Sequence, residues 1–116
     1  MTLRTKRVYQ PRIKSDGYRI LVDRLWPRGI SKELAGVDLW LKDVAPSLEL
    51  RRWFAHKPER FKIFSERYID ELTHNPAAGE LFSIVKSHQS ITLVYAAKDD
   101  VHNNAAVLRN YLERRI

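Results

Sequence analysis

The chain contains no cysteine. This absence excludes disulfide bonds, a catalytic thiolate and zinc sites built on cysteine ligands. No apolar run approaches the roughly 20 residues that a membrane-spanning helix needs. The first residues are charged from Arg4 onward, and a signal peptide would be apolar there. We therefore expect a cytoplasmic protein with no membrane partner.

Motifs for metals and common cofactors are also missing. The four histidines show no paired metal-ligand spacing, and no His-Glu-x-x-His motif occurs. The chain has neither a Gly-x-Gly-x-x-Gly motif nor a P-loop, which argues against a familiar dinucleotide or magnesium–nucleotide site. We expect neither a bound metal nor a cofactor.

Acidic residues are scarce in the N-terminal third. Between Met1 and Lys32 only Asp16 and Asp23 are acidic, against nine lysines and arginines, and the whole chain carries a net charge of +7. A basic excess of this kind attracts anionic partners, either small molecules or nucleic acid. A charge that serves only solubility explains the excess equally well.

The length and composition predict one domain, residues 1–116. A chain of 116 residues with 44% hydrophobic content can bury one real core. No internal repeat or Gly/Ser-rich linker divides it.

Three segments have the apolar pattern of strands. Residues 5–9 alternate weakly and predict a short first strand, while residues 18–24 and 91–97 contain continuous apolar runs typical of strands buried on both faces. Residues 38–44 fit either a third strand or an irregular segment.

Helices fill the rest of the chain. Residues 31–34 predict a brief helical turn, and Ser47 predicts the N-cap of a longer helix. Pro58 suits the first position of the next helix, on which Arg67 and Glu71 are expected to pair one turn apart. Further helices are expected after the break at residues 75–76 and from about residue 102. Strands joined by helical crossovers predict a small α/β domain with a mainly parallel sheet of about four strands.

An unusual set of side chains follows the strand at 18–24. Residues 23–29 supply a carboxylate (Asp23), two guanidiniums (Arg24 and Arg28) and an indole (Trp26). Loops at the carboxyl ends of buried strands are where α/β proteins place ligand sites. Because a guanidinium matches phosphate or carboxylate oxygens two at a time, this loop predicts an anionic ligand.

The strand at 91–97 ends in the same way. It leads into Lys98, Asp99, His102 and Asn103 and then into a helix N-terminus, which itself favours anions. If the two strands are parallel, both loops lie at one edge of the sheet and form one site. His102 is the best candidate for a general acid or base, because its unperturbed pKa lies near neutrality.

Each of these residues also has a purely structural interpretation. Asp23 can anchor its loop through backbone N–H groups, and Asp99 or Asn103 can cap the last helix. Trp26 can cover the core, and the arginines can be solvated or paired with Asp23. Arg51 is expected on a solvated helix face. His56 follows Trp53 and Phe54 and can reach the cleft, but a surface or capping role is favoured.

The chain resembles the family called domain of unknown function 488, in its short YeaO-like branch. The resemblance covers nearly the whole chain. It is carried by the segments KRVY (6–9), DGYRILVDRLWPRG (16–29), WLKDVAPS (40–47), RWFAH (52–56), YIDEL (68–72), TLVYAAKD (92–99) and HN (102–103). Longer members of the wider family have a Cys and an acid after the last strand. This chain has Lys98 and Asp99 there, so thiol chemistry does not carry over.

Two hypotheses follow from the sequence. In the first, a cleft binds a phosphate-bearing or other anionic ligand, such as a nucleotide or a nucleic-acid end. The sequence leaves open whether the protein also acts on that ligand as a metal-independent hydrolase or transferase. Arg24, Arg28 and Lys98 hold the anion, Trp26 covers the ligand and Asn103 contributes to binding. His102 moves a proton, with Asp23 and Asp99 orienting either this imidazole or the arginines. The alternative is a nucleic-acid-binding or regulatory module that uses the basic N-terminal third.

Overall fold

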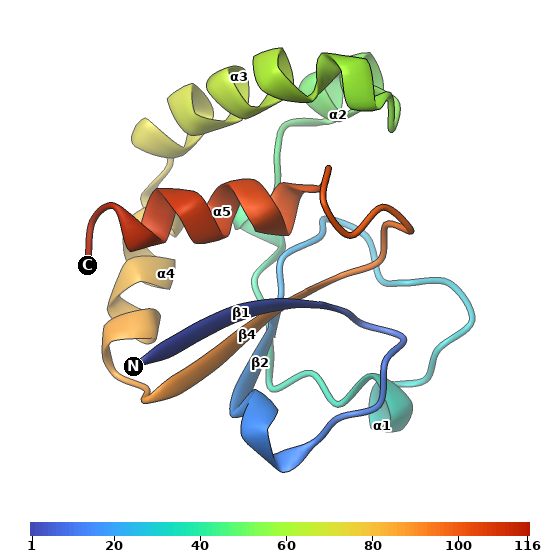
Figure 1. Ribbon diagram of the computed structural model, residues 1–116, viewed down its shortest axis with the longest axis vertical. Coiled ribbons are helices and arrows are strands. Elements are labelled where there is room, and N and C mark those ends of the chain that lie inside the picture. The colour runs from blue at the N-terminus through green and yellow to red at the C-terminus, as the bar shows by residue number, and fades with distance from the viewer.

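The strands of the computed structural model, which describes residues 1–116, form one sheet (Figure 1). Its members are β1 (Thr2–Arg7), β2 (Tyr18–Leu21), β3 (Leu39–Trp40) and β4 (Ser90–Tyr95), in the order β1-β4-β2-β3. Every neighbouring pair is parallel. The α/β class and the parallel four-stranded sheet expected from the sequence are confirmed.

Five α-helices connect or follow the strands. They are α1 (Lys32–Ala35), α2 (Leu48–Phe54), α3 (Phe61–Thr73), α4 (Pro76–Lys86) and α5 (Asn104–Glu113). Short 3₁₀ turns occupy η1 (Lys14–Asp16), η2 (Lys42–Val44) and η3 (Pro58–Arg60). None of the helices is long and apolar enough to cross a bilayer.

The helix starts follow their sequence signals. Ser31, Ser47 and Asn75 each accept a backbone N–H of the first turn through the side chain, which satisfies a donor that the helix itself leaves free. Pro58 opens η3, which leads directly into α3. The expected pairing of Arg67 with Glu71 is wrong. Glu71 instead accepts the Ser47 N–H and hydroxyl at 2.8 and 2.6 Å, while the Arg67 guanidinium lies 4.7 Å from the centre of the Trp53 ring.

The boundaries of all three expected strands differ from the predicted ones, and β4 runs from Ser90 to Tyr95 where residues 91–97 were expected. β1 begins three residues earlier than expected, because Thr2 to Arg7 pair in register with Ser90 to Tyr95. β2 ends at Leu21, and the Val22 N–H makes one last bond to the Val94 carbonyl. The sequence left a strand or an irregular segment open for residues 38–44. The structure has some of each, since the two-residue strand β3 is followed by the 3₁₀ turn η2.

The sheet has a large core on one face and a small one on the other. The large core joins Ile20, Val22, Ile91 and Leu93 to side chains of α2, α3, α4 and α5. Burying each such aliphatic side chain contributes about 1.5–3 kcal/mol. The small core holds only Val8, Leu21, Ala35 and Val94 and is covered by α1 and its flanking loops. Figure 1 shows α1 on the side of the sheet opposite to α3 and α5.

The connections of β2 and β4 leave the sheet in opposite directions. The two strands are neighbours, but β2 leads to α1 on one face and β4 leads to α5 on the other. A crevice opens at the carboxyl ends of parallel strands where the chain divides in this way, and α/β proteins bind ligands in such crevices. The topology therefore directs attention to residues 22–29 and 96–103.

Candidate anion-binding cleft

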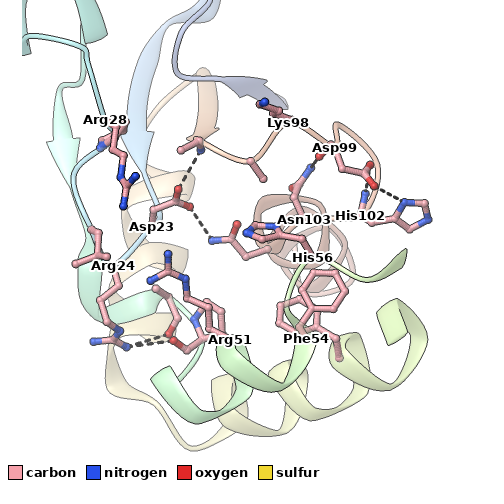
Figure 2. Close-up of a pocket in the computed structure, with 18 of the residues that line it drawn as sticks. Asp23, Arg24, Arg28, Arg51, Phe54, His56, Lys98, Asp99, His102 and Asn103 are labelled. Atoms are coloured by element: carbon pink, nitrogen blue, oxygen red, sulfur yellow. Dashed lines mark hydrogen bonds and ion pairs between the residues drawn. The ribbon is translucent and has the colours of Figure 1, made fainter. Parts of the chain in front are cut away.

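A cleft of about 650 Å³ lies at the carboxyl ends of β2 and β4. It is lined by the loop after β2, the loop after β4, the end of α2 and the start of α5 (Figure 2). Its volume is in the range of small-molecule sites. All eight residues expected at the site contribute to its lining: Asp23, Arg24, Trp26, Arg28, Lys98, Asp99, His102 and Asn103.

Asp23 joins the two loops at the floor of the cleft. Its Oδ2 accepts the Ala96 N–H at 3.0 Å, and its Oδ1 accepts the Asn104 side-chain amide at 3.1 Å. The Asp23 carbonyl accepts the indole N–H of Trp40 at 2.7 Å. Burial raises the pKa of the Asp23 carboxyl above its ordinary value, although these N–H donors and the charges of Arg51 and His56 act in the opposite direction.

Asp99 organises the turn that leads into α5. Its Oδ1 accepts the N–H groups of Val101 and His102, each at 2.9 Å, and its Oδ2 lies 2.9 Å from His102 Nδ1. The backbone N–H bonds, together with His102, lower the pKa of Asp99 to about 2. Asp99 is therefore a carboxylate throughout the neutral range, and it fixes the orientation of the imidazole.

His102 lies at the outer side of the cleft. Its ring packs edge-on against Phe61, with centroids 5.0 Å apart, and in Figure 2 it points away from Asp23. Because Nδ1 is directed at Asp99, Nε2 is the nitrogen that remains for any other partner. The geometry orients His102 through Asp99 but does not bring Asp23 to it.

Asn103 is the N-cap of α5. Its Oδ1 accepts the Ala106 N–H at 2.8 Å, its Nδ2 donates to the Asp99 carbonyl at 3.0 Å, and the residue is only 2% exposed. The capping interpretation thus describes what this side chain does in the fold, with its amide oxygen and nitrogen both engaged.

Arg24 and Trp26 hold the loop after β2. The Arg24 guanidinium faces the carbonyl oxygens of Ala45 and Pro46, both at 3.4 Å, and points away from the centre of the cleft in Figure 2. The Trp26 indole donates to the Ile30 carbonyl at 2.9 Å and packs on the small core. Both side chains line the cleft, but their polar ends are turned into the protein.

Three cationic side chains of the cleft are exposed and donate no hydrogen bond within the protein. They are Arg28, Arg51 and Lys98, and they come from the β2 loop, α2 and the β4 loop. Figure 2 shows the guanidiniums of Arg28 and Arg51 directed toward Asp23. A guanidinium without an internal partner is free to bind an anion at no cost in lost protein contacts.

The contribution of Arg51 and Phe54 of α2 to the cleft was not expected from the sequence, which offered only His56 as a residue that could reach it. Arg51, Phe54 and His56 all line it, together with Asn104 of α5. Two successive residues after α2, Ala55 and His56, have φ values of 49° and 55°, which is costly for residues with a Cβ. The helix break between Phe54 and Pro58 was the available signal, since it predicts a sharp turn without giving its direction.

No group of three or more His, Asp or Glu side chains that could hold a metal ion occurs in the structure.

Comparison with known proteins places the chain in a family. The family model described as "Inactive DUF488-N3 subclade" matches residues 2–116. The chain belongs to the DUF488 family. The DUF488 chain is also 44% identical to the uncharacterized protein YeaO of Escherichia coli over 112 residues, which cover 97% of each chain. It is 44% identical to the uncharacterized protein Rv3073c of Mycobacterium tuberculosis over 113 residues, which cover 97% of this chain and 95% of that one. No solved structure matches it significantly.

Proposed function

We propose that this DUF488 protein binds a phosphate-bearing or other anionic small molecule in the cleft between the β2 and β4 loops. The observation that carries the proposal is the meeting of Arg28, Arg51 and Lys98 at one cleft, from three separate elements. None of the three donates a hydrogen bond to the protein, so their charge is available to a ligand. The N-terminus of α5 adds its positive dipole end at the same place.

Binding is better supported than catalysis. The matching family model carries the word "inactive" in its description. Of the three residues expected to be catalytic, Asp99 is engaged by two backbone N–H groups and His102, and His102 points away from Asp23. An acid–base pair acting on one substrate needs both groups within hydrogen-bond reach of it. We therefore propose a binding protein in place of the hydrolase or transferase that the sequence left open.

The alternative, a nucleic-acid-binding module built on the N-terminal third, loses support in the structure. Lys6 and Arg19 both bond Asp16, and Arg12 bonds Asp38. The two carboxylates thus balance two of these three positive charges, and one positive charge remains. Arg4 donates to the Ser15 carbonyl and Arg7 donates to the carbonyls of Ala96 and Ala97, so both guanidiniums already have partners within the protein.

Calorimetric titration of Arg51→Ala and Arg52→Ala with adenosine 5′-monophosphate tests the proposal. The two arginines are adjacent and exposed on α2, but only Arg51 lines the cleft. We expect Arg51→Ala to weaken binding about tenfold, since a charge-assisted hydrogen bond contributes about 1.5–3 kcal/mol. Arg52→Ala is expected to bind like the unmodified protein.

The salt dependence separates the cleft from a nucleic-acid surface. Binding in the cleft involves a few cations and gives a shallow fall of affinity with salt, whereas a backbone-tracking surface gives a steep one. Equal losses for the two arginine variants, or a short oligonucleotide that binds with a steep salt slope and is insensitive to Arg51→Ala, would contradict the proposal.

A further inference from the structure

Asp23 is a carboxylate at the floor of a cleft whose three exposed cationic side chains are Arg28, Arg51 and Lys98. Arg28 and Arg51 are directed toward it in Figure 2, and Lys98 lies on the opposite loop. The carboxylate is fixed by the Ala96 N–H on one oxygen and by the Asn104 amide on the other. It therefore cannot turn away when a ligand enters, and whatever occupies the cleft has to accommodate it.

The Asp23 carboxylate retains hydrogen-bonding capacity. A carboxylate offers about four acceptor positions, and the protein donates one N–H to each Asp23 oxygen. Asp23 is only partly buried, and its remaining surface lines the cleft. A bare anion such as inorganic phosphate would bring like charges together at this point, whereas an N–H or O–H donor would complete the carboxylate's bonds.

Two exposed hydrophobic side chains line the cleft: Tyr9 and Leu25 leave 38% and 60% of their surface exposed. The stacked rings of Phe54 and Phe64 also contribute to the lining, but they are only 6% and 2% exposed. A ligand with a flat, weakly polar body would cover the two exposed side chains and gain from the burial.

We infer that the ligand is bifunctional: its anionic group binds Arg28, Arg51 and Lys98, and a flat ring carrying a hydrogen-bond donor reaches Asp23. A nucleoside monophosphate with an exocyclic amine has this chemistry. Inorganic phosphate has only the anionic part, and a free nucleoside has only the ring and its donors. The inference rests on the proposed function and adds to it the assignment of Asp23 as the group that selects the ligand.

The test compares three probes by calorimetry: adenosine 5′-monophosphate, inorganic phosphate and adenosine. In the unmodified protein we expect the monophosphate to bind at least tenfold more tightly than either of the other two. Phosphate affinity equal to that of the monophosphate would overturn the inference while leaving an anion-binding cleft intact. If none of the three binds, the proposed function fails along with it.

Asp23→Asn provides a second readout, which does not depend only on the ratio of the monophosphate and phosphate affinities in the unmodified protein. The asparagine has the same shape, and its oxygen can still accept the Ala96 N–H. We expect it to weaken monophosphate binding about tenfold and to leave phosphate binding equal or stronger, because one negative charge is gone. Asp100→Asn is the matched control, since Asp100 is exposed on the β4 loop and does not line the cleft. A parallel loss of both ligands in Asp23→Asn would assign Asp23 a purely structural role and overturn the inference.

Discussion

Asn103 connects the β4 loop to α5 through a single amide. It caps the helix at Ala106 and holds the Asp99 carbonyl, and it does both while almost fully buried. Removing it leaves a helix N–H and a loop carbonyl without partners. The cost of such a loss exceeds that of an exposed cap, because the freed groups have little access to water.

We predict that Asn103→Ala lowers the free energy of unfolding by about 2 kcal/mol, the upper end of the range for N-cap removal. Urea unfolding followed by circular dichroism measures it. Asn110→Ala is the control, because Asn110 is exposed on the same helix and its side chain makes no hydrogen bond. Equal effects of the two substitutions would show that the cap contributes nothing particular.

Arg19 is a buried cation on the α1 side of the sheet. Its guanidinium is 0% exposed and bonds Asp16 at 2.9 Å and the Ala35 carbonyl at 2.7 Å. Burial by itself would raise the pKa of Asp16, but the hydrogen bonds from Lys6, the Ile13 N–H and Arg19 outweigh it and lower the pKa. A carboxyl whose pKa is lowered by folding stabilises the protein above its unfolded pKa and loses that contribution as the pH falls.

Asp16→Asn is therefore expected to be most destabilising at neutral pH. Breaking a buried ion pair from one side costs about 3–5 kcal/mol. The difference from the unmodified protein should shrink as the pH falls from the ordinary aspartate pKa of about 3.9 toward the lowered pKa of folded Asp16, since Asp16 is protonated first in the unfolded chain and at lower pH in the folded protein. Urea unfolding at pH 7 and pH 3 measures both differences, and a difference that stays constant or grows in acid would contradict this account.

At the residue scale, the sequence identified the loops well and the roles of single side chains less well. All eight expected residues line one cleft. Sequence patterns could not tell that Arg24 turns to the Ala45 and Pro46 carbonyls while Arg28 stays free, because both are arginines in one loop. That difference depends on where η2 and α2 pack against the loop.

At the element scale, α2 supplies the part of the cleft that the sequence did not predict. The strand-end pattern concerns only loops that follow strands, whereas Arg51, Phe54 and His56 approach from a helix and its C-terminal turn. Their placement follows from Ala55 and His56, whose left-handed backbone conformation reverses the chain before Pro58. Helix C-termini commonly need a left-handed residue, and glycine takes this conformation without strain.

Ala55→Gly is predicted to stabilise the protein by up to about 1 kcal/mol, because it removes the Cβ strain at a left-handed position. Thermal unfolding measures the change. Ala106→Gly, in α5, is the matched control and should destabilise by about 0.5–1 kcal/mol, since glycine is unfavourable within a helix. A loss of stability in Ala55→Gly would mean that the turn after α2 is not strained.

At the scale of the whole molecule, the cleft arises because the chain leaves β2 toward one face of the sheet and leaves β4 toward the other. Parallel strands with helical crossovers could be predicted from the apolar runs at residues 18–24 and 91–97, and with them the meeting of the two loops. The strand order could not, because it depends on β1 pairing with β4 and not with β2. The order β1-β4-β2-β3 makes β4 and β2 the two central strands, and the small core under α1 lies on the face opposite to the core that α5 covers, so their connections leave on opposite faces.

If one cleft between the two loops binds an anion, both loops must respond to that ligand together. A titration of the ¹⁵N-labelled protein with adenosine 5′-monophosphate, followed by amide chemical shifts, tests this. We predict that the N–H signals of residues 23–29 and 96–104, with the end of α2, shift together along one binding curve. Shifts spread over β1 and η1, or loops that respond with separate affinities, would contradict it.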